Sequence, residues 1–354
     1  MPAIFEFSER DWEQHTQNWQ AWWAGELPRP LVMIENPVRR RETLELTNAF
    51  LRDWPIDQVL DYYQARLETT LVLGDAWPKW FPFYGAGVLA AFMGAELLCA
   101  PKEGTIWFEP AVTEPVTALT PRLDPHNAWW QRILALTQAA VNRWQNQICV
   151  GFTDLGGNLD VLASLRGSQN LLLDLYDDPA AVAQASRQAT REWLQAYDRL
   201  YALTSITGRG STPWAAIWAP GRTYMLQSDF CAMISPRMFE HFVLPDLAAC
   251  CQAIAYPFYH LDGRGQLPHL DMLLSLEKLR GVQWIPGDGQ PAPQDWPAVL
   301  QRIRQSGKLC QLYVTAAGAL QIAHQFGGRG FAFYITDTLT PQEAQSFLET
   351  LHAT

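Results

Sequence analysis

The residues best suited to chemistry in this sequence are a histidine and an aspartate two positions apart, His260 and Asp262. They follow the apolar run 255–259, which predicts a strand that ends where the polar residues begin. In extended backbone, residues i and i+2 point to the same side, so the imidazole and the carboxylate enter the same space. The pair predicts either a divalent-metal site or a carboxylate that orients the imidazole for proton transfer, and both interpretations stay open.

Further candidates follow other predicted strands. Asp154 comes after the apolar run 148–152 and is a second catalytic candidate, while Asp337 follows 330–335 and is the predicted third metal ligand. Aromatic side chains are predicted to wall a substrate pocket, and loop residues with charged side chains are predicted to contact the substrate. These substrate-binding candidates are Trp218, Tyr224, Asp229, Trp284, Asp288 and Arg39.

An alternation of strands and helices has to position these residues. Apolar runs predict strands that begin near residues 31, 148, 214, 255, 282, 309 and 330, and the second strand lies at either 80–84 or 105–108. A segment of helical periodicity follows each run. Eight such units are typical of a (β/α)8 TIM barrel, in which functional groups gather at the carboxyl ends of the strands. We therefore predict a single α/β barrel domain over residues 30–354.

Residues 1–29 are predicted to form a helical extension. Trp12, Trp19, Trp22 and Trp23 recur at helical spacing over residues 11–24, and Gly25 follows as a stop. We interpret this helix as a cap on one end of the core, in preference to an aromatic lid over the substrate.

The composition of the chain indicates which kinds of molecule it can bind. The formal charge of −10 and the single basic cluster at residues 39–41 argue against a nucleic-acid or anionic-membrane surface, so a small-molecule substrate is expected. A basic and apolar leader is absent from the amino-terminal residues, and the most apolar window, 85–100, is too short for a membrane span, which predicts a cytoplasmic protein. The 16 tryptophans exceed what core packing usually needs, and we expect some of them to line a ligand cavity or a homodimer interface.

Three sequence blocks resemble the uroporphyrinogen decarboxylase superfamily, which includes cobalamin-dependent methyltransferases. They are SLRGSQNLLLDLYDDP at residues 164–179, SDFCAMISPRMFEHFVLPDL at 228–247 and YHLDG at 259–263. The resemblance covers roughly residues 80–352 and implies a (β/α)8 barrel with its site at the carboxyl ends of the strands.

The sequence also departs from that superfamily. The segment IENPVRRRE does not reproduce the arginine-rich loop of the decarboxylases. The thiol methyltransferases bind zinc through an H-x-C and a later cysteine, whereas this chain has His260 and Asp262 at the first position and Asp337 near the second. With carboxylates in place of sulfur, the predicted metal is zinc or a harder divalent ion.

The resemblance implies methyl transfer, assisted by this metal and linked to a corrinoid that a partner protein carries. Two alternatives stay open. One is a decarboxylase or other lyase that uses His260 and Asp262 for acid-base chemistry. The other is a non-catalytic binding module on a degenerate barrel, which would have a closed or apolar mouth.

Overall fold

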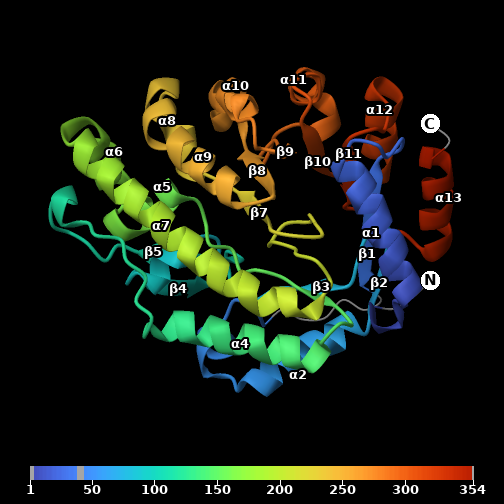
Figure 1. The fold of residues 1–354 in the computed structure, drawn as a ribbon, viewed down its shortest axis with the longest axis horizontal. Coiled ribbons are helices and arrows are strands. Elements are labelled where there is room, and N and C mark those ends of the chain that lie inside the picture. Colours follow the sequence, from blue (N-terminus) through green and yellow to red (C-terminus); the bar gives the residue numbers. More distant parts are fainter. Residues whose placement is uncertain (1–3, 38–43, 353–354) are drawn as a thin grey trace.

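A seven-stranded sheet forms the centre of the computed structural model, which describes residues 4–37 and 44–352 (Figure 1). Six of its strands are parallel, and β2 runs antiparallel to β1. In spatial order the strands are β2 (Thr70–Gly74), β1 (Leu31–Pro37), β11 (Phe331–Ile335), β10 (Leu309–Val314), β9 (Gly281–Ile285), β8 (Tyr256–Asp262) and β7 (Thr223–Leu226). The protein is therefore a mixed α/β fold built on a mainly parallel sheet.

Two strand pairs lie outside this sheet. β3 (Lys79–Trp80) and β6 (Cys149–Val150) pair in parallel, whereas β4 (Glu96–Ala100) and β5 (Thr105–Glu109) form an antiparallel hairpin. Of the two alternatives for the second parallel strand, the one near residue 80 therefore agrees with the structure. Strand pairing within the described residues keeps β3 and β6 apart from the seven-stranded sheet, so closure into an eight-stranded barrel stays a prediction.

The strand predicted at residues 214–218 is wrong. This segment is a loop held by an isolated antiparallel bridge between Ser211 and Ala219, and the strand that joins the sheet is β7, at residues 223–226. The loop is apolar because it packs inside the protein: the Trp214 ring lies 5.2 Å from that of His260, and Ala216 N–H donates to the Tyr313 hydroxyl at 3.4 Å. Burial, rather than strand formation, accounts for this apolar run.

Helices follow most of the parallel strands, and α8 to α12 lie along the outside of β7 to β11 (Figure 1). Side-chain caps begin several of them, including Ser8 at α1, Asp178 at α7 and Thr315 at α12. No helix within the described ranges is both long and apolar enough to cross a membrane. The helices are α1 (Glu9–Trp23), α2 (Ile56–Leu67), α3 (Leu89–Phe92), α4 (Ala128–Trp144), α5 (Asn158–Arg166), α6 (Ser168–Asp177), α7 (Pro179–Thr204), α8 (Pro236–Phe242), α9 (Leu244–Ala253), α10 (Leu270–Ser275), α11 (Pro297–Gln305), α12 (Ala316–Phe326) and α13 (Pro341–His352).

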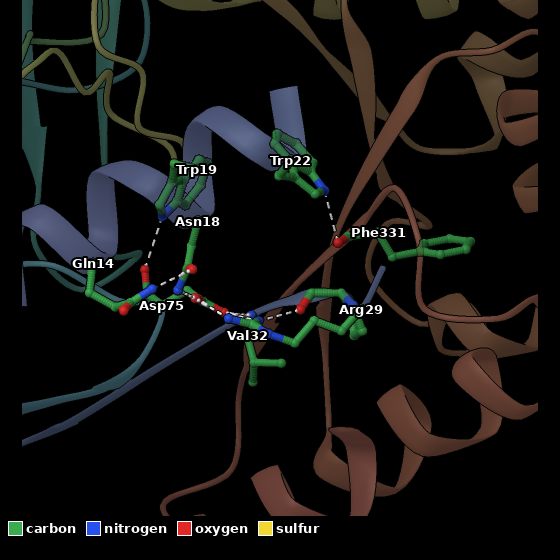
Figure 2. Close-up of polar contacts among 9 residues, drawn as sticks. Gln14, Asn18, Trp19, Trp22, Arg29, Val32, Asp75 and Phe331 are labelled. Carbon is green, nitrogen blue, oxygen red and sulfur yellow. Dashed lines mark hydrogen bonds and ion pairs between the residues drawn. The ribbon is translucent and has the colours of Figure 1, made fainter. Parts of the chain in front are cut away.

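Helix α1 lies at the amino ends of the strands. The Trp22 indole donates to the carbonyl of Phe331, the first residue of β11, at 2.9 Å (Figure 2). Arg280, which directly precedes β9, donates to the carbonyl of Trp23 at 2.6 Å, and the Trp23 indole donates to Trp218 O at 2.9 Å. The helix is therefore far from the carboxyl ends of the strands and does not cover the predicted site.

His15 of α1 is buried in an aromatic cluster. Its ring lies 4.7–5.9 Å from those of Trp12, Trp19, Trp77 and Trp218, and only 3% of the residue is exposed. Burial lowers the pKa of His15 to about 3, and the nearby Asp75 opposes this only in part. The unfolded chain, with an ordinary histidine pKa near 6.5, therefore binds the proton more readily than the folded protein.

The free energy of unfolding should consequently fall as the pH falls through the window between about 6.5 and 3. The loss attributable to His15 is on the order of 3 kcal/mol between pH 7 and pH 4. Urea denaturation at several pH values measures it. His15→Leu should reduce the change in unfolding free energy with pH, whereas the exposed control His126→Leu should leave this change unaltered. If the unfolding free energy of His15→Leu varied with pH as steeply as that of the unaltered protein, His15 would not be the source of the effect.

Candidate metal and substrate site

Three ligand-type side chains converge at the carboxyl end of β8. The carboxylate oxygens of Asp229 and Asp262 and an imidazole nitrogen of His260 all lie within 4.8 Å of one another. His260 and Asp262 are on β8, with Nε2 and Oδ2 3.9 Å apart, as the i, i+2 spacing predicts. Asp229 begins the 3-10 turn that follows β7 (Asp229–Met233). One imidazole and two carboxylates at this spacing are suited to a divalent cation.

The third member of this group differs from the predicted ligand. Asp337 Oδ2 accepts a hydrogen bond from Ala316 N–H at 2.7 Å, at the start of α12. Its carboxylate therefore stabilises the helix N-terminus and lies outside the group that His260 and Asp262 form. Asp229, predicted to contact the substrate, takes the place that the sequence analysis gave to Asp337.

Asp160, in the first turn of α5, holds the Asp229 loop in place. Its carboxylate accepts the backbone N–H groups of Asp229 at 3.0 Å and Phe230 at 2.7 Å. Burial and the neighbouring charge of Asp229 raise the pKa of Asp160 to about 7. Although the residue is partly open to solvent, desolvation of its carboxylate and the charge of Asp262 likewise raise the pKa of Asp229 to about 6.

Asp154 belongs to the same acidic region. Its Oδ1 accepts the Gly156 N–H at 2.8 Å and an amide N–H of Gln227 at 3.4 Å. Burial raises its pKa to about 7, and the charges of Asp229 and Asp160 add to this effect. Carboxylates crowded in this way repel one another when ionised, and a bound divalent cation would relieve the repulsion.

Gln283, which is not among the predicted site residues, orients His260. It lies directly opposite His260 in the parallel pairing of β8 with β9, and its Oε1 bonds to His260 Nδ1. The Gln283 amide group in turn donates to Gln311 on β10. With Nδ1 engaged, Nε2 is left facing Asp262, and a metal-ligating histidine is commonly held by such a bond on its other nitrogen.

Burial also lowers the pKa of His260, while its bond to Gln283 and the charge of Asp262 oppose this effect. The neutral form is the one that binds a metal. The signal for Gln283 in the sequence was a lone polar residue within the apolar run 282–285, next along the chain to the strand that carries His260.

Comparisons with known proteins show a shared fold. The sequence matches no family model, and a search of curated proteins finds no match. Among solved structures, the chain is similar to a methyltransferase from Methanosarcina mazei, with a TM-score of 0.61 over 96% of this chain and 98% of that one. Sequence identity is 12%, so this likeness concerns the fold alone.

Trp284, one of the predicted aromatic wall residues, faces away from the site. It follows Gln283 on β9, and side chains of successive strand residues point to opposite faces. Because Gln283 points toward His260, Trp284 points toward the helices, where its ring lies 5.5 Å from that of Trp296. The residue is fully buried.

Tyr224 and Trp218 are buried too. The Tyr224 hydroxyl accepts the Leu155 N–H at 2.7 Å, and its ring packs edge-on against Trp193 of α7 at 4.8 Å. Trp218 packs against His15 of α1, near the amino ends of the strands. All three rings are therefore buried in contacts with other aromatic side chains, and a wall of Trp218, Tyr224 and Trp284 around a substrate stays a prediction.

Two loop candidates complete the set. Asp288 is exposed in the turn after β9 and is not part of the group of Asp229, His260 and Asp262. Arg39 lies outside the described residues.

A pocket of about 550 Å³ opens beside the acidic residues, and Asp160 and Asp229 form part of its lining. Backbone segments pack closely against residues of its lining: a Cβ on Gly156 would lie 2.5 Å from Gly87 Cα, and one on Gly157 would lie 2.1 Å from Gln227 O. Glycine at these positions is therefore a steric requirement of the site.

Proposed function

We propose that this protein is an enzyme that transfers methyl groups, as a divergent member of the uroporphyrinogen decarboxylase superfamily. The fold shared with a methyltransferase and the three sequence blocks support this proposal. The reaction would take place at the carboxyl ends of the parallel strands, where function gathers in such folds.

The proposal includes closure of the strands into a (β/α)8 barrel. Two kinds of contact support closure. Lys79 on β3 forms an ion pair with Glu35 on β1, and its ammonium lies 6.0 Å from the Tyr334 ring on β11. On the other side, Phe152 N–H, just after β6, donates to Thr212 O at 3.1 Å in the segment that leads to β7.

The observation that carries the proposal is the convergence of Asp229, His260 and Asp262. These residues would hold a divalent ion through one nitrogen and two carboxylate oxygens, a donor set that suits zinc or a harder ion. When bound, the ion would supply Lewis-acid chemistry, activating the group that accepts or releases the methyl. Asp160 positions the Asp229 ligand, and Gln283 fixes the ring of His260.

The remaining parts of the proposal rest on the sequence. A small organic molecule would be one methyl donor or acceptor, and a corrinoid carried by a partner protein would be the other. The resemblance to cobalamin-dependent methyltransferases supports the corrinoid. A homodimer is proposed only on the number of tryptophans, and most of these are buried within the chain.

A lyase that uses acid-base chemistry is the second candidate. The pKa values of about 7 at Asp154 and Asp160 favour it, because a carboxylic acid that is protonated near neutral pH can donate a proton. The third alternative, a binding module with a closed or apolar mouth, has less support, since Asp160 and Asp229 line an open pocket.

A spectroscopic assay tests methyl transfer. Purified protein, free cob(I)alamin, a divalent metal and a panel of methylated amines, ethers and thioethers are mixed, and the absorbance change to methylcobalamin is followed. We expect conversion with at least one donor, and a rate at least about 100-fold lower for His260→Ala. Equal rates for the two proteins, or carbon dioxide release from a carboxylated panel with no methyl transfer, would contradict the proposal.

A further inference from the structure

Two exposed apolar side chains face the same pocket beside the acidic residues. Trp107 on β5 is 58% exposed, and Met233 at the end of the turn after β7 is 53% exposed. Both line the pocket of about 550 Å³, together with Phe108 and Phe230. Leaving large apolar side chains in water is unfavourable, and those that border a cavity often mark a ligand site.

The charged side chains that line this pocket in the described part of the chain are all acidic. Among the residues that the structure describes, its lining contains the carboxylates of Asp160 and Asp229 and no lysine, arginine or histidine. A third acid stands at its edge, because the Trp107 indole donates to Glu103 Oε2 at 3.0 Å. An anionic ligand would be repelled here, whereas a cation would gain from the carboxylates and from the face of an aromatic ring.

The volume of the pocket indicates how large that cation can be. Pockets of about 300–1,000 Å³ accommodate organic molecules, and this one is much larger than a bare ion requires. A divalent ion held by Asp229, His260 and Asp262 would share only Asp229 with the lining. The pocket therefore has room for a second ligand next to the metal site.

We infer that this pocket binds an organic cation, a quaternary ammonium or similar group on a small apolar body. The cationic group lies against Trp107 near Asp160 and Asp229, and the apolar body contacts Phe108, Phe230 and Met233. This inference rests on the proposed function because it assigns the substrate class of the same site, but its binding test requires neither metal nor turnover.

Three probes of nearly the same shape test the inference. Choline, 3,3-dimethyl-1-butanol and 3,3-dimethylbutanoate carry a similar branched body with a positive, a neutral and a negative charge, respectively. Each is titrated into the full-length protein in the presence of EDTA, and binding is measured by calorimetry and by saturation-transfer NMR. We expect choline to bind roughly tenfold more tightly than the alcohol, and the carboxylate to bind more weakly than either.

Variants assign the binding to this pocket. Trp107→Leu and Asp229→Asn should each weaken choline binding roughly tenfold and leave the alcohol nearly unaffected. Tyr176→Leu removes another exposed aromatic ring, 74% exposed and outside this pocket, and should change nothing. Equal affinity for choline and the alcohol, or an unaltered affinity in Trp107→Leu, would overturn the inference. Choline binding without metal binding would support the inference and contradict the metal-assisted function.

Discussion

Replacing His260 by alanine is expected to weaken divalent-metal binding by at least about 100-fold. The change removes the only nitrogen from the proposed ligand group, whose three donor atoms lie within 4.8 Å of one another. Loss of a residue that only orients a ligand costs about 10–100-fold in metal affinity, so loss of the ligand itself should cost more. Calorimetric titration of EDTA-treated, dialysed protein with zinc and manganese measures the effect.

Thermal unfolding gives a second readout of the same binding. A metal that binds only the folded protein stabilises it by about 2.7 kcal/mol at a free concentration of 100 times Kd. The melting temperature of the unaltered protein should therefore rise with added metal, and that of His260→Ala or Asp229→Asn should rise much less. Gln283→Leu should fall between them, because it leaves the ligand in place and removes the bond that orients it.

Asp337→Asn is the matched control for these variants. The sequence makes Asp337 the third ligand, whereas its carboxylate in the structure accepts the Ala316 N–H at the start of α12. Metal affinity should therefore be unchanged in this variant. If Asp337→Asn lost the metal and Asp229→Asn kept it, the ligand set assigned from the structure would be wrong.

The difference between these two aspartates shows which part of the site a sequence can predict. His260 and Asp262 are near neighbours in one strand, so the geometry of extended backbone is sufficient to bring them together. Asp229 reaches them because the half-buried Asp160 carboxylate accepts hydrogen bonds from two consecutive N–H groups of its loop. That contact joins residues 69 positions apart, and periodicity along the chain carries no signal for it.

The aromatic residues show a similar limit. Large aromatic residues such as Trp218, Tyr224 and Trp284 suit a pocket wall as well as a protein core. Only the direction in which each side chain points distinguishes these two roles. In the structure all three face helices, whereas Trp107 of the hairpin, which the sequence analysis passed over, faces the pocket. The parallel strands are easier to predict, because a short apolar run followed by a segment of helical periodicity can be recognised from neighbouring residues alone.

Replacing Asp75 by alanine should lower the free energy of unfolding by about 3–5 kcal/mol. The Asp75 carboxylate is buried directly after β2 and accepts two hydrogen bonds from Arg29, at 2.6 and 2.9 Å, one from Val32 N–H at 2.9 Å and one from Asn18 at 2.8 Å (Figure 2). Its backbone carbonyl accepts the Trp19 indole N–H at 3.0 Å. The alanine variant would leave a guanidinium and two further donors without their acceptor.

An exposed ion pair provides the comparison for this change. Asp271 bonds to Arg302 at 2.7 Å, but its side chain is 84% exposed, and such pairs contribute about 0–1 kcal/mol. Urea denaturation should therefore separate Asp75→Ala from Asp271→Ala by several kcal/mol, and equal midpoints would contradict the structural role of Asp75. Because Asp75 ties α1 to β1 at the amino ends of the strands, folded Asp75→Ala protein should bind metal with unaltered affinity. Substitutions at the amino ends of the strands would then change stability, whereas substitutions at the carboxyl ends would change metal binding.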